Sequence, residues 1–172
     1  MNEPSTCHSL DEIGYLAGVI DSLRVTGDAA EIGVWNGYTA KQIHGHATGK
    51  VHLFDTFGGI MEEHAEPGWK PGLYRCTQQE VRGFIGDDFI FHEGDICQTK
   101  FEVEDNEFVF VHIDLDVYAP LKDCLPYFYR RLIRGGAMLI SNYDTAHPGV
   151  MKAVEETFKV DKTFSRYVLI KK

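Results

Sequence analysis

Two carboxylates that could take part in catalysis, Asp114 and Asp116, stand two positions apart directly after an almost continuously apolar run. That run, residues 108–113, is rich in β-branched and aromatic side chains, as expected of a central parallel strand buried on both faces. Carboxylates beside such a strand need partners, which are a cation, a metal ion or a substrate hydroxyl. The two acids are therefore candidates for binding or proton transfer at the edge where open α/β sheets bind ligands.

A glycine-containing turn earlier in the chain could bind a nucleoside. Residues 29–55 predict a strand, a loop with Gly33 and Gly37, a helix, and a second strand that ends at Asp55. Glycine lets the backbone approach a ligand, the helix N-terminus offers free N–H groups, and the acid can accept hydrogen bonds from ribose hydroxyls. Since the loop lacks the G-x-G-x-x-G spacing, it suits a phosphate-free ligand such as S-adenosylmethionine better than a dinucleotide. An ordinary strand-to-helix turn is the alternative.

Two further segments could complete a ligand site. Asp95 and Ile96 follow the predicted third strand, residues 89–93, where the acid could accept a hydrogen bond from an adenine amino group and Ile96 could pack on the ring. Gly-Asp is also common in simple turns, which is the alternative. Residues 57–74 form a long connection after the second strand, and we expect them to be a lid or substrate loop. His64 in this loop is a candidate general base, or else a solvated surface histidine.

The segments around these residues have the pattern of a Rossmann-like fold. Two capping boxes, residues 9–12 (SLDE) and 77–80 (TQQE), predict helix starts. Apolar runs that alternate with segments of helical spacing predict a mostly parallel sheet between two layers of helices, which is a three-layer α/β fold. Residues 164–170 are expected to form a closing antiparallel strand, paired with a short partner near residues 158–161.

Length and composition describe one acidic globular domain over residues 1–172. The formal net charge of −9 argues against a surface that binds nucleic-acid phosphates or an anionic membrane. No apolar stretch reaches the length of a membrane span. Four cysteines lie far apart without a C-x-x-C pair, and the N-terminus has no apolar signal-peptide run, so we expect reduced thiols in a cytoplasmic protein.

Five segments together resemble the macrocin O-methyltransferase family, whose members are class I S-adenosylmethionine-dependent enzymes that methylate sugar hydroxyls of natural products. The segments are EIGVWNGYTA, LFDTFGG, HEGDI, VHIDLDVYAPLKDCLPYFYRRLIRGGAMLISNYD and HPGVMKAVEETF. The resemblance implies a Rossmann-like class I methyltransferase fold with an antiparallel C-terminal strand. It further implies O-methylation of a small-molecule hydroxyl, on a sugar or glycosylated natural product, with S-adenosyl-L-methionine and Mg²⁺ as cofactors. Relatives form dimers, which makes a homodimer the expected assembly.

The resemblance also implies a role for each matching residue. Asp114 matches a magnesium ligand, and Asp116 matches the general base that takes the proton from the sugar hydroxyl, a role for which His64 is the other candidate. Ser141 and Asn142 stand where the family has two adjacent acidic metal ligands. The cofactor-binding residues implied are Glu31, Gly33, Trp35, Asn36, Gly37, Asp55, Thr56, Asp95, Ile96 and Asp114.

The pair Ser141 and Asn142 keeps more than one hypothesis open. A hydroxyl and an amide replace two carboxylates in a site for a hard cation that prefers oxygen ligands, although Asn142 could still ligate through its carbonyl oxygen. The first hypothesis is an active O-methyltransferase, and the alternative is a catalytically silent relative that binds a cofactor or a partner. A nicotinamide-dependent dehydrogenase is a third hypothesis, which the incomplete glycine pattern disfavours.

Overall fold

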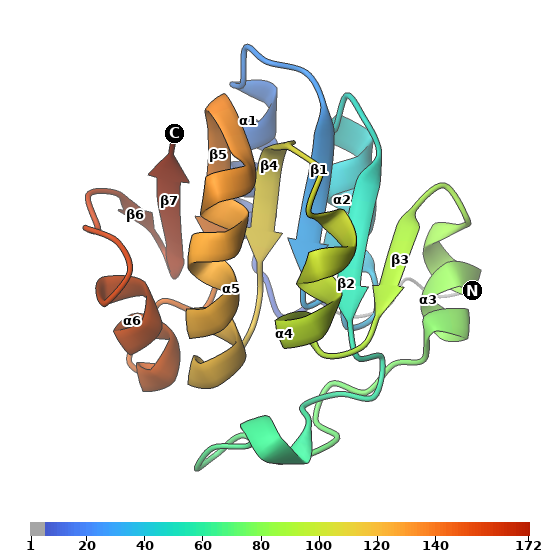
Figure 1. Cartoon of the computed structure of the whole chain (residues 1–172), viewed down its shortest axis with the longest axis vertical. Coiled ribbons are helices and arrows are strands. Elements are labelled where there is room, and N and C mark those ends of the chain that lie inside the picture. Colours follow the sequence, from blue (N-terminus) through green and yellow to red (C-terminus); the bar gives the residue numbers. More distant parts are fainter. Residues whose placement is uncertain (1–5) are drawn as a thin grey trace.

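The structure, a computed structural model, describes residues 6–172, which form one sheet of seven strands in the order β3-β2-β1-β4-β5-β7-β6. The first five strands of the chain are parallel, and the last two run antiparallel at one edge (Figure 1). This arrangement confirms the predicted mostly parallel sheet with an antiparallel C-terminal strand. The strands are β1 (Asp28–Ile32), β2 (Val51–Asp55), β3 (Ile90–Glu93), β4 (Phe108–Ile113), β5 (Leu132–Ile140), β6 (Thr163–Phe164) and β7 (Tyr167–Lys171).

Helices cover both faces of the sheet, so the sheet is the middle of three layers (Figure 1). Both predicted capping boxes are present, at the N-termini of the first and third helices. One face is covered by α4 (Ile96–Thr99), α5 (Tyr118–Arg131) and α6 (Pro148–Glu155), and the other by α1 (Leu10–Asp21), α2 (Tyr38–His46) and α3 (Gln78–Ile85). Two short 3-10 helices, η1 (Glu62–His64) and η2 (Lys100–Val103), lie in connections.

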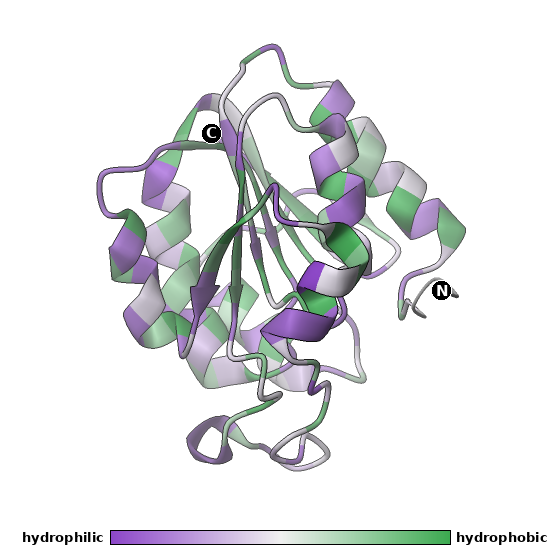
Figure 2. Cartoon of the chain, turned by 90° about the vertical axis from the view of Figure 1, so that its right-hand side faces the viewer, coloured by the Kyte–Doolittle hydropathy of each residue, from purple (hydrophilic) through white to green (hydrophobic). Residues whose placement is uncertain are grey.

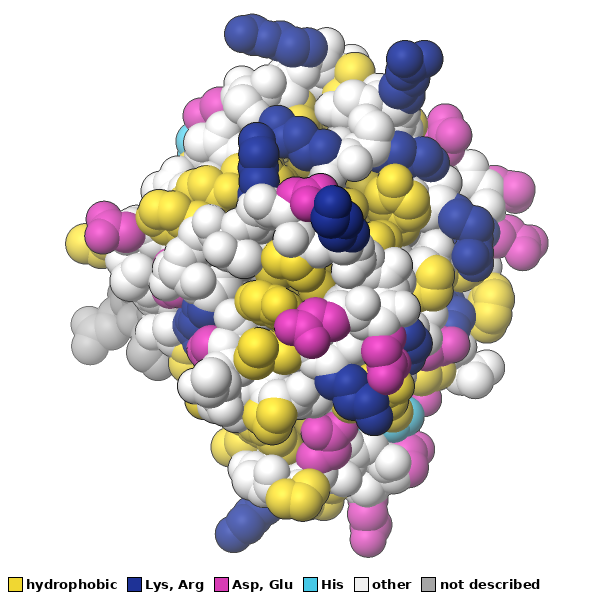
Figure 3. Space-filling view, turned by 90° about the vertical axis from the view of Figure 1, so that its left-hand side faces the viewer, with side chains coloured by type: hydrophobic (Ala, Val, Ile, Leu, Met, Phe, Trp, Pro, Cys, Tyr) yellow, Lys and Arg dark blue, Asp and Glu magenta, His cyan; other side chains and the backbone are white. Residues whose placement is uncertain are grey.

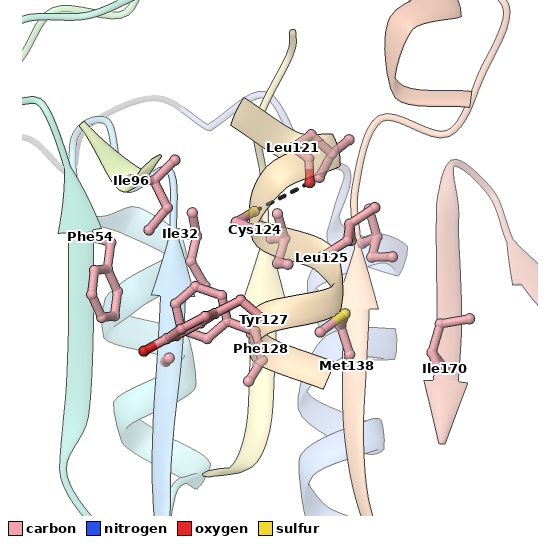
Figure 4. Close-up of a cluster of buried hydrophobic side chains, with 14 of the residues drawn as sticks. Ile32, Phe54, Ile96, Leu121, Cys124, Leu125, Tyr127, Phe128, Met138 and Ile170 are labelled. Atoms are coloured by element: carbon pink, nitrogen blue, oxygen red, sulfur yellow. Dashed lines mark hydrogen bonds between the residues drawn. The ribbon is translucent and has the colours of Figure 1, made fainter. Parts of the chain in front are cut away.

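The hydrophobic core lies on both faces of the central strands. Every residue of β4 is buried, as predicted for a strand between two helix layers. Figure 4 shows one cluster, in which Phe128 of α5 packs against Phe54 of β2, with centroids 5.4 Å apart, and Ile32 of β1 and Leu121 of α5 belong to the same cluster. The strands in Figure 2 are mostly hydrophobic, while the helices mix hydrophobic and hydrophilic residues, as amphipathic helices do.

The order of the strands creates a crevice at the carboxyl ends of β1 and β4. The chain winds outward from β1 through β2 to β3, then crosses back to β4 on the other side of β1. At such a switch point the loops after neighbouring strands leave toward opposite faces, which opens a ligand crevice between them. The segment from β2 to α3, which contains η1, lies below this edge in Figure 1. The loop after β1 and the acids after β4 therefore meet at one place.

The C-terminal hairpin differs in register from the prediction. The partner of the closing strand is residues 163–164, and not residues 158–161, and the strand itself spans Tyr167–Lys171. The two-residue turn between β6 and β7, Ser165 and Arg166, accounts for the difference, since Ser165 adopts a left-handed φ of 52° that permits a tight turn. Because Val168 pairs with Ile140 at the end of β5, the turn brings Arg166 to the carboxyl edge of the sheet.

Two further observations concern the surface and the lengths of the helices. Acidic and basic side chains are interspersed with hydrophobic ones on the face at the β6 edge of the sheet (Figure 3). Within residues 6–172, none of the helices is long and apolar enough to cross a membrane.

Candidate functional site

A cavity at the carboxyl edge of the sheet collects most of the residues that the sequence singled out. Its walls come from the loop after β1, the ends of β2, β4 and β5, the N-terminus of α4 and residues 57–74, the expected lid. Three predicted residues, Glu31, Gly37 and Ser141, are not in its lining. The predicted residues that line it are Gly33, Trp35, Asn36, Asp55, Thr56, His64, Asp95, Ile96, Asp114, Asp116 and Asn142.

The glycine loop is held in shape by Asp55. Its Oδ2 accepts the backbone N–H groups of Val34 (2.7 Å) and Trp35 (2.9 Å), and its Oδ1 accepts that of Phe57 (2.7 Å). Burial raises the pKa of Asp55, and the three N–H donors oppose that shift. A carboxylate offers about four acceptor positions, so about one remains for a ligand hydroxyl. Asp55 therefore joins the two loops that border the cavity and keeps about one acceptor position for a ligand.

Gly33 is needed where the tips of β1 and β4 meet. Its φ is +84°, and a Cβ at this position would lie 2.2 Å from the backbone oxygen of Asp114. Gly37 also has a positive φ, of +83°, and a Cβ there would meet Ile85 and Val81 of α3. Gly37 thus begins α2 and packs against α3 instead of lining the cavity.

Asp95 and Ile96 line the cavity at the N-terminus of α4. Oδ1 of Asp95 accepts the N–H of Cys97 (2.9 Å) and caps α4, and Oδ2 lies 3.3 Å from Nε2 of His64. Burial raises the pKa of Asp95, but the donors Cys97 and His64 outweigh it and hold the pKa below its ordinary value. His64 is therefore paired with the predicted adenine-binding acid, whereas its predicted role was a general base.

Residues 57–74, the expected lid, contact the start of α5 and the residue before α6. The N–H of Tyr118, at the start of α5, donates to Oε1 of Glu66. The ring of Trp69 stacks on His147, with centroids 4.8 Å apart. Lid residue Tyr74 lines the cavity beside Trp35, and burial raises the pKa of Tyr74 to about 12, so its hydroxyl is neutral. Residues 57–74 thus contribute the ring of Tyr74 to the cavity wall.

Asn142 links the two carboxylates after β4. Its Nδ2 donates to Oδ1 of Asp114 (2.7 Å) and to Oδ1 of Asp116 (2.9 Å), and its Oδ1 accepts from Nη1 of Arg166 (2.9 Å). This orientation of the amide is the one that the charges require, because the opposite one would place its oxygen against two carboxylates and its NH₂ group against a guanidinium. Asn142 has a left-handed φ of 62°, a conformation that asparagine tolerates better than most residues.

Asp114 has a second partner from the N-terminal segment. Nε2 of His8 lies 2.9 Å from Oδ2 of Asp114, and the other ring nitrogen lies 3.1 Å from the hydroxyl of Tyr167. Burial lowers the pKa of His8, but the hydrogen bond to Asp114 outweighs burial and the pKa is raised. Burial raises the pKa of Asp114, yet His8 brings it below its ordinary value. Each oxygen of Asp114 thus has one partner within the protein.

Asp116 faces a histidine of its own. Nε2 of His147 lies 3.5 Å from Oδ1 of Asp116, and Nδ1 lies 2.7 Å from Oδ1 of Asp144. The hydrogen bond with Asp116 is the largest cause of a raised pKa at His147, while burial raises the pKa of Asp116. The arrangement Asp144–His147–Asp116 can hold and pass on a proton at the cavity wall.

The free energy of unfolding should depend on pH because His147 is paired with Asp116 and Asp144. Since the folded-state pKa of His147 is raised above its ordinary value of about 6.5, protonated His147 stabilises the fold fully below that value. The contribution is lost as the pH rises through the folded-state pKa. Urea unfolding of the wild type and of His147→Gln is expected to differ by about 1 kcal/mol or less at acidic pH, and by less above neutrality. A difference that grows with pH would contradict the assignment.

Glu31 and Ser141 form a buried layer beneath the cavity. Oε1 of Glu31 lies 2.9 Å from Nδ1 of His112, and Nε2 of His112 lies 2.8 Å from the hydroxyl of Ser141. Burial raises the pKa of Glu31 well above its ordinary value and lowers the pKa of His112 to about 3, so both shifts favour uncharged forms. Glu31 therefore supports the site through His112, and the hydroxyl of Ser141 has that histidine as its partner.

The predicted magnesium ligands do not fit a magnesium site. Mg²⁺ requires near-octahedral oxygen ligands. Here the Ser141 hydroxyl is fully buried against His112, the oxygen of Asn142 accepts from a guanidinium, and both oxygens of Asp114 already accept hydrogen bonds. The guanidinium of Arg166 thus places a positive charge beside the amide oxygen through which Asn142 would bind a divalent cation.

Three residues of the site had no role in the sequence analysis. His8 precedes α1, Arg166 is in the hairpin turn, and His147 precedes α6, yet all three line the cavity. For His147 the spacing of Asp144 and His147 after a strand end was an available signal. His8 and Arg166 offered none, because they reach the site only through the packing of the chain ends.

Comparisons with known proteins agree with this architecture. The family model of macrocin-O-methyltransferases (TylF) matches residues 8–168. A relative from Streptomyces olivaceus, 8-demethyl-8-(2,3-dimethoxy-alpha-L-rhamnosyl)-tetracenomycin-C 4'-O-methyltransferase, is 25% identical over 167 residues, with 81% of this chain and 64% of the relative covered.

Two solved structures share the fold. The calicheamicin methyltransferase CalS11 superposes with a TM-score of 0.76 at 17% identity, over 96% of this chain and 80% of that one. The O-methyltransferase NovP superposes with a TM-score of 0.78 at 18% identity, over 98% and 83%.

Proposed function

Because the chain belongs to the macrocin-O-methyltransferase family, we propose that it transfers a methyl group from S-adenosyl-L-methionine to a hydroxyl of a small molecule. The acceptor we propose is a sugar or a glycosylated natural product. The tetracenomycin relative is named for a rhamnosyl 4'-O-methyltransferase activity, and the chain spans 64% of its length. The observation that carries the proposal is that Asp116 lines the same cavity as the turn after β1, Asp55 and Asp95.

The cofactor would lie along the carboxyl ends of β1 to β3. In this proposal the turn at Gly33 receives the methionine part, Asp55 binds a ribose hydroxyl, and Asp95 with Ile96 holds the adenine. S-Adenosylmethionine supplies an electrophilic methyl group, so the protein has to position the acceptor and receive its proton. Alignment of this kind contributes up to about 7–11 kcal/mol.

Asp116 is the proton acceptor in this mechanism. Its carboxylate is held by Asn142 and faces His147, so a proton taken from the acceptor hydroxyl can be shared with the imidazole. Trp35 and Tyr74 line the same cavity and offer aromatic surface to a sugar ring. The predicted alternative base, His64, is paired with Asp95 and is left without a role in proton transfer. No step requires the magnesium ion, because its expected ligands are engaged elsewhere.

Cofactor binding should depend strongly on Asp55. Asp55→Ala leaves the N–H groups of Val34, Trp35 and Phe57 without their acceptor and removes the ribose ligand. We expect the affinity for S-adenosylhomocysteine, measured by calorimetry, to fall by at least about tenfold. Asp161→Ala, at an exposed position, is the matched control. Equal affinity of Asp55→Ala and the wild type would rule out the proposed cofactor position.

A screen for methyl transfer tests the activity itself. Purified protein, S-adenosylmethionine carrying a labelled methyl group and a library of nucleotide sugars, glycosides and phenols should yield a labelled ether from one acceptor class. Saturable binding of S-adenosylhomocysteine without product across the library would instead favour a catalytically silent relative.

We further propose that residues 1–172 act as one methyltransferase unit in the cytoplasm, with residues 57–74 as the substrate loop. Support for the compartment comes from the cysteines, which are free thiols at Cys7, Cys76, Cys97 and Cys124. The homodimer remains a prediction from the family.

A further inference from the structure

We infer that the amide of Asn142 and the guanidinium of Arg166 replace the divalent cation of this site, so that the protein neither binds nor needs magnesium. The inference rests on the proposed methyl transfer for its functional meaning, while its structural part depends only on contacts within the described chain.

Two carboxylates have to be held together at this site. Asp114 and Asp116 each place an oxygen within 2.9 Å of one nitrogen atom, Nδ2 of Asn142. Carboxylates this close repel each other unless donors or cations stand between them. A bridging metal ion is one solution, and an amide with two N–H groups directed at two oxygens is another. In this chain the amide of Asn142 stands between the two carboxylates.

The positive charge comes from Arg166. Its Nη1 lies 2.9 Å from Oδ1 of Asn142, the one atom through which Asn142 could bind a metal. A hydrogen bond to that oxygen polarises the amide and strengthens its donation to the carboxylates. A cation bound at Oδ1 would have to displace the guanidinium and would be repelled by its charge.

Arg166 is anchored, so it is not easily displaced. Its Nε donates to Oε1 of Glu12 (3.2 Å), and its Nη2 donates to the backbone oxygen of Cys7. Glu12 is buried, belongs to the capping box of α1, and also accepts from the hydroxyl of Ser165 (2.8 Å). The hairpin turn and the first helix thus fix the guanidinium from two sides.

The other expected ligands also have partners within the described chain. Oδ2 of Asp114 faces Nε2 of His8, and the hydroxyl of Ser141 faces Nε2 of His112. Asn142 and Arg166 act as positioning residues in this arrangement. They hold Asp116 at the cavity and offset the charge of Asp114.

Metal binding to the wild-type protein is the direct test. Metal-stripped protein is titrated by calorimetry with Mg²⁺ and Zn²⁺ and by electron paramagnetic resonance with Mn²⁺, next to Asp114→Asn as the control for the site. We expect no binding that Asp114→Asn abolishes, and the same methyl-transfer rate with a chelator as with magnesium. Saturable binding of any of the three ions that is lost in Asp114→Asn would overturn the inference.

A gain-of-binding variant tests the same idea in the other direction. Asn142→Asp combined with Arg166→Gln restores one acidic ligand and removes the competing cation. Its affinity for Mn²⁺ should exceed that of the wild type by at least about tenfold. Equal Mn²⁺ affinity in this variant, if its circular dichroism matches the wild type, would count against the inference.

The outcomes separate this inference from the proposed function. A protein that binds S-adenosylhomocysteine, makes no methylated product and binds no metal would contradict the activity and leave the metal replacement intact. A methyltransferase whose activity requires a metal ion would support the proposed function and contradict the metal replacement.

Discussion

Asp116→Asn is expected to lower kcat for methyl transfer by about 10²–10⁴-fold, the usual contribution of a positioned proton acceptor. The asparagine has nearly the same shape as Asp116, and its oxygen can still accept the N–H of Asn142, so local packing should persist. The amide cannot take a proton from the acceptor hydroxyl. The measurement is kcat with the acceptor class found in the screen, together with the affinity for S-adenosylhomocysteine, which should not change.

The control for this variant is an acid outside the cavity. Asp161→Asn changes an exposed carboxylate whose neighbour is Lys159, and its kcat should equal that of the wild type. If Asp116→Asn turned over at the wild-type rate, Asp116 would not be the base. His147 would then be the next residue to test, because its Nε2 lies in the same cavity.

Gly33→Ala is expected to destabilise the fold by about 2–5 kcal/mol, because two costs act at one position. A left-handed φ of +84° disfavours any residue with a Cβ, and that Cβ would lie 2.2 Å from the backbone oxygen of Asp114. The tips of β1 and β4 would have to separate, which also disturbs the turn that we propose to bind the cofactor. Urea unfolding should show a lower midpoint, and S-adenosylhomocysteine binding should be lost.

Gly14→Ala is the matched control for a glycine change. Gly14 lies inside α1, and a Cβ there would meet nothing within 4 Å. Alanine favours helix by up to about 1 kcal/mol over glycine, so this variant should be as stable as the wild type or more stable. Similar midpoints for Gly33→Ala and Gly14→Ala would show that the close approach of β1 and β4 is not required.

Much of the architecture follows from local patterns in the sequence. The capping boxes at Ser9 and Thr77, the buried run of β4 and the acid at the end of β2 were each predicted from neighbouring residues and are present. Such features depend on backbone periodicity and on contacts a few residues apart. The partner of the C-terminal strand was predicted wrongly, because its register depends on a two-residue turn with a left-handed Ser165.

The sequence alone also places the acids Asp55, Asp95, Asp114 and Asp116 at one edge, since the carboxyl ends of parallel strands share that edge. Their hydrogen-bond partners could not be read in the same way. His8 reaches Asp114 across 106 positions, and Arg166 reaches Asn142 from a hairpin turn. Contacts of this kind depend on how distant elements pack and not on any local pattern. Tertiary structure therefore decided that Asn142 donates to both carboxylates and accepts from a guanidinium, where the sequence had suggested a metal ligand.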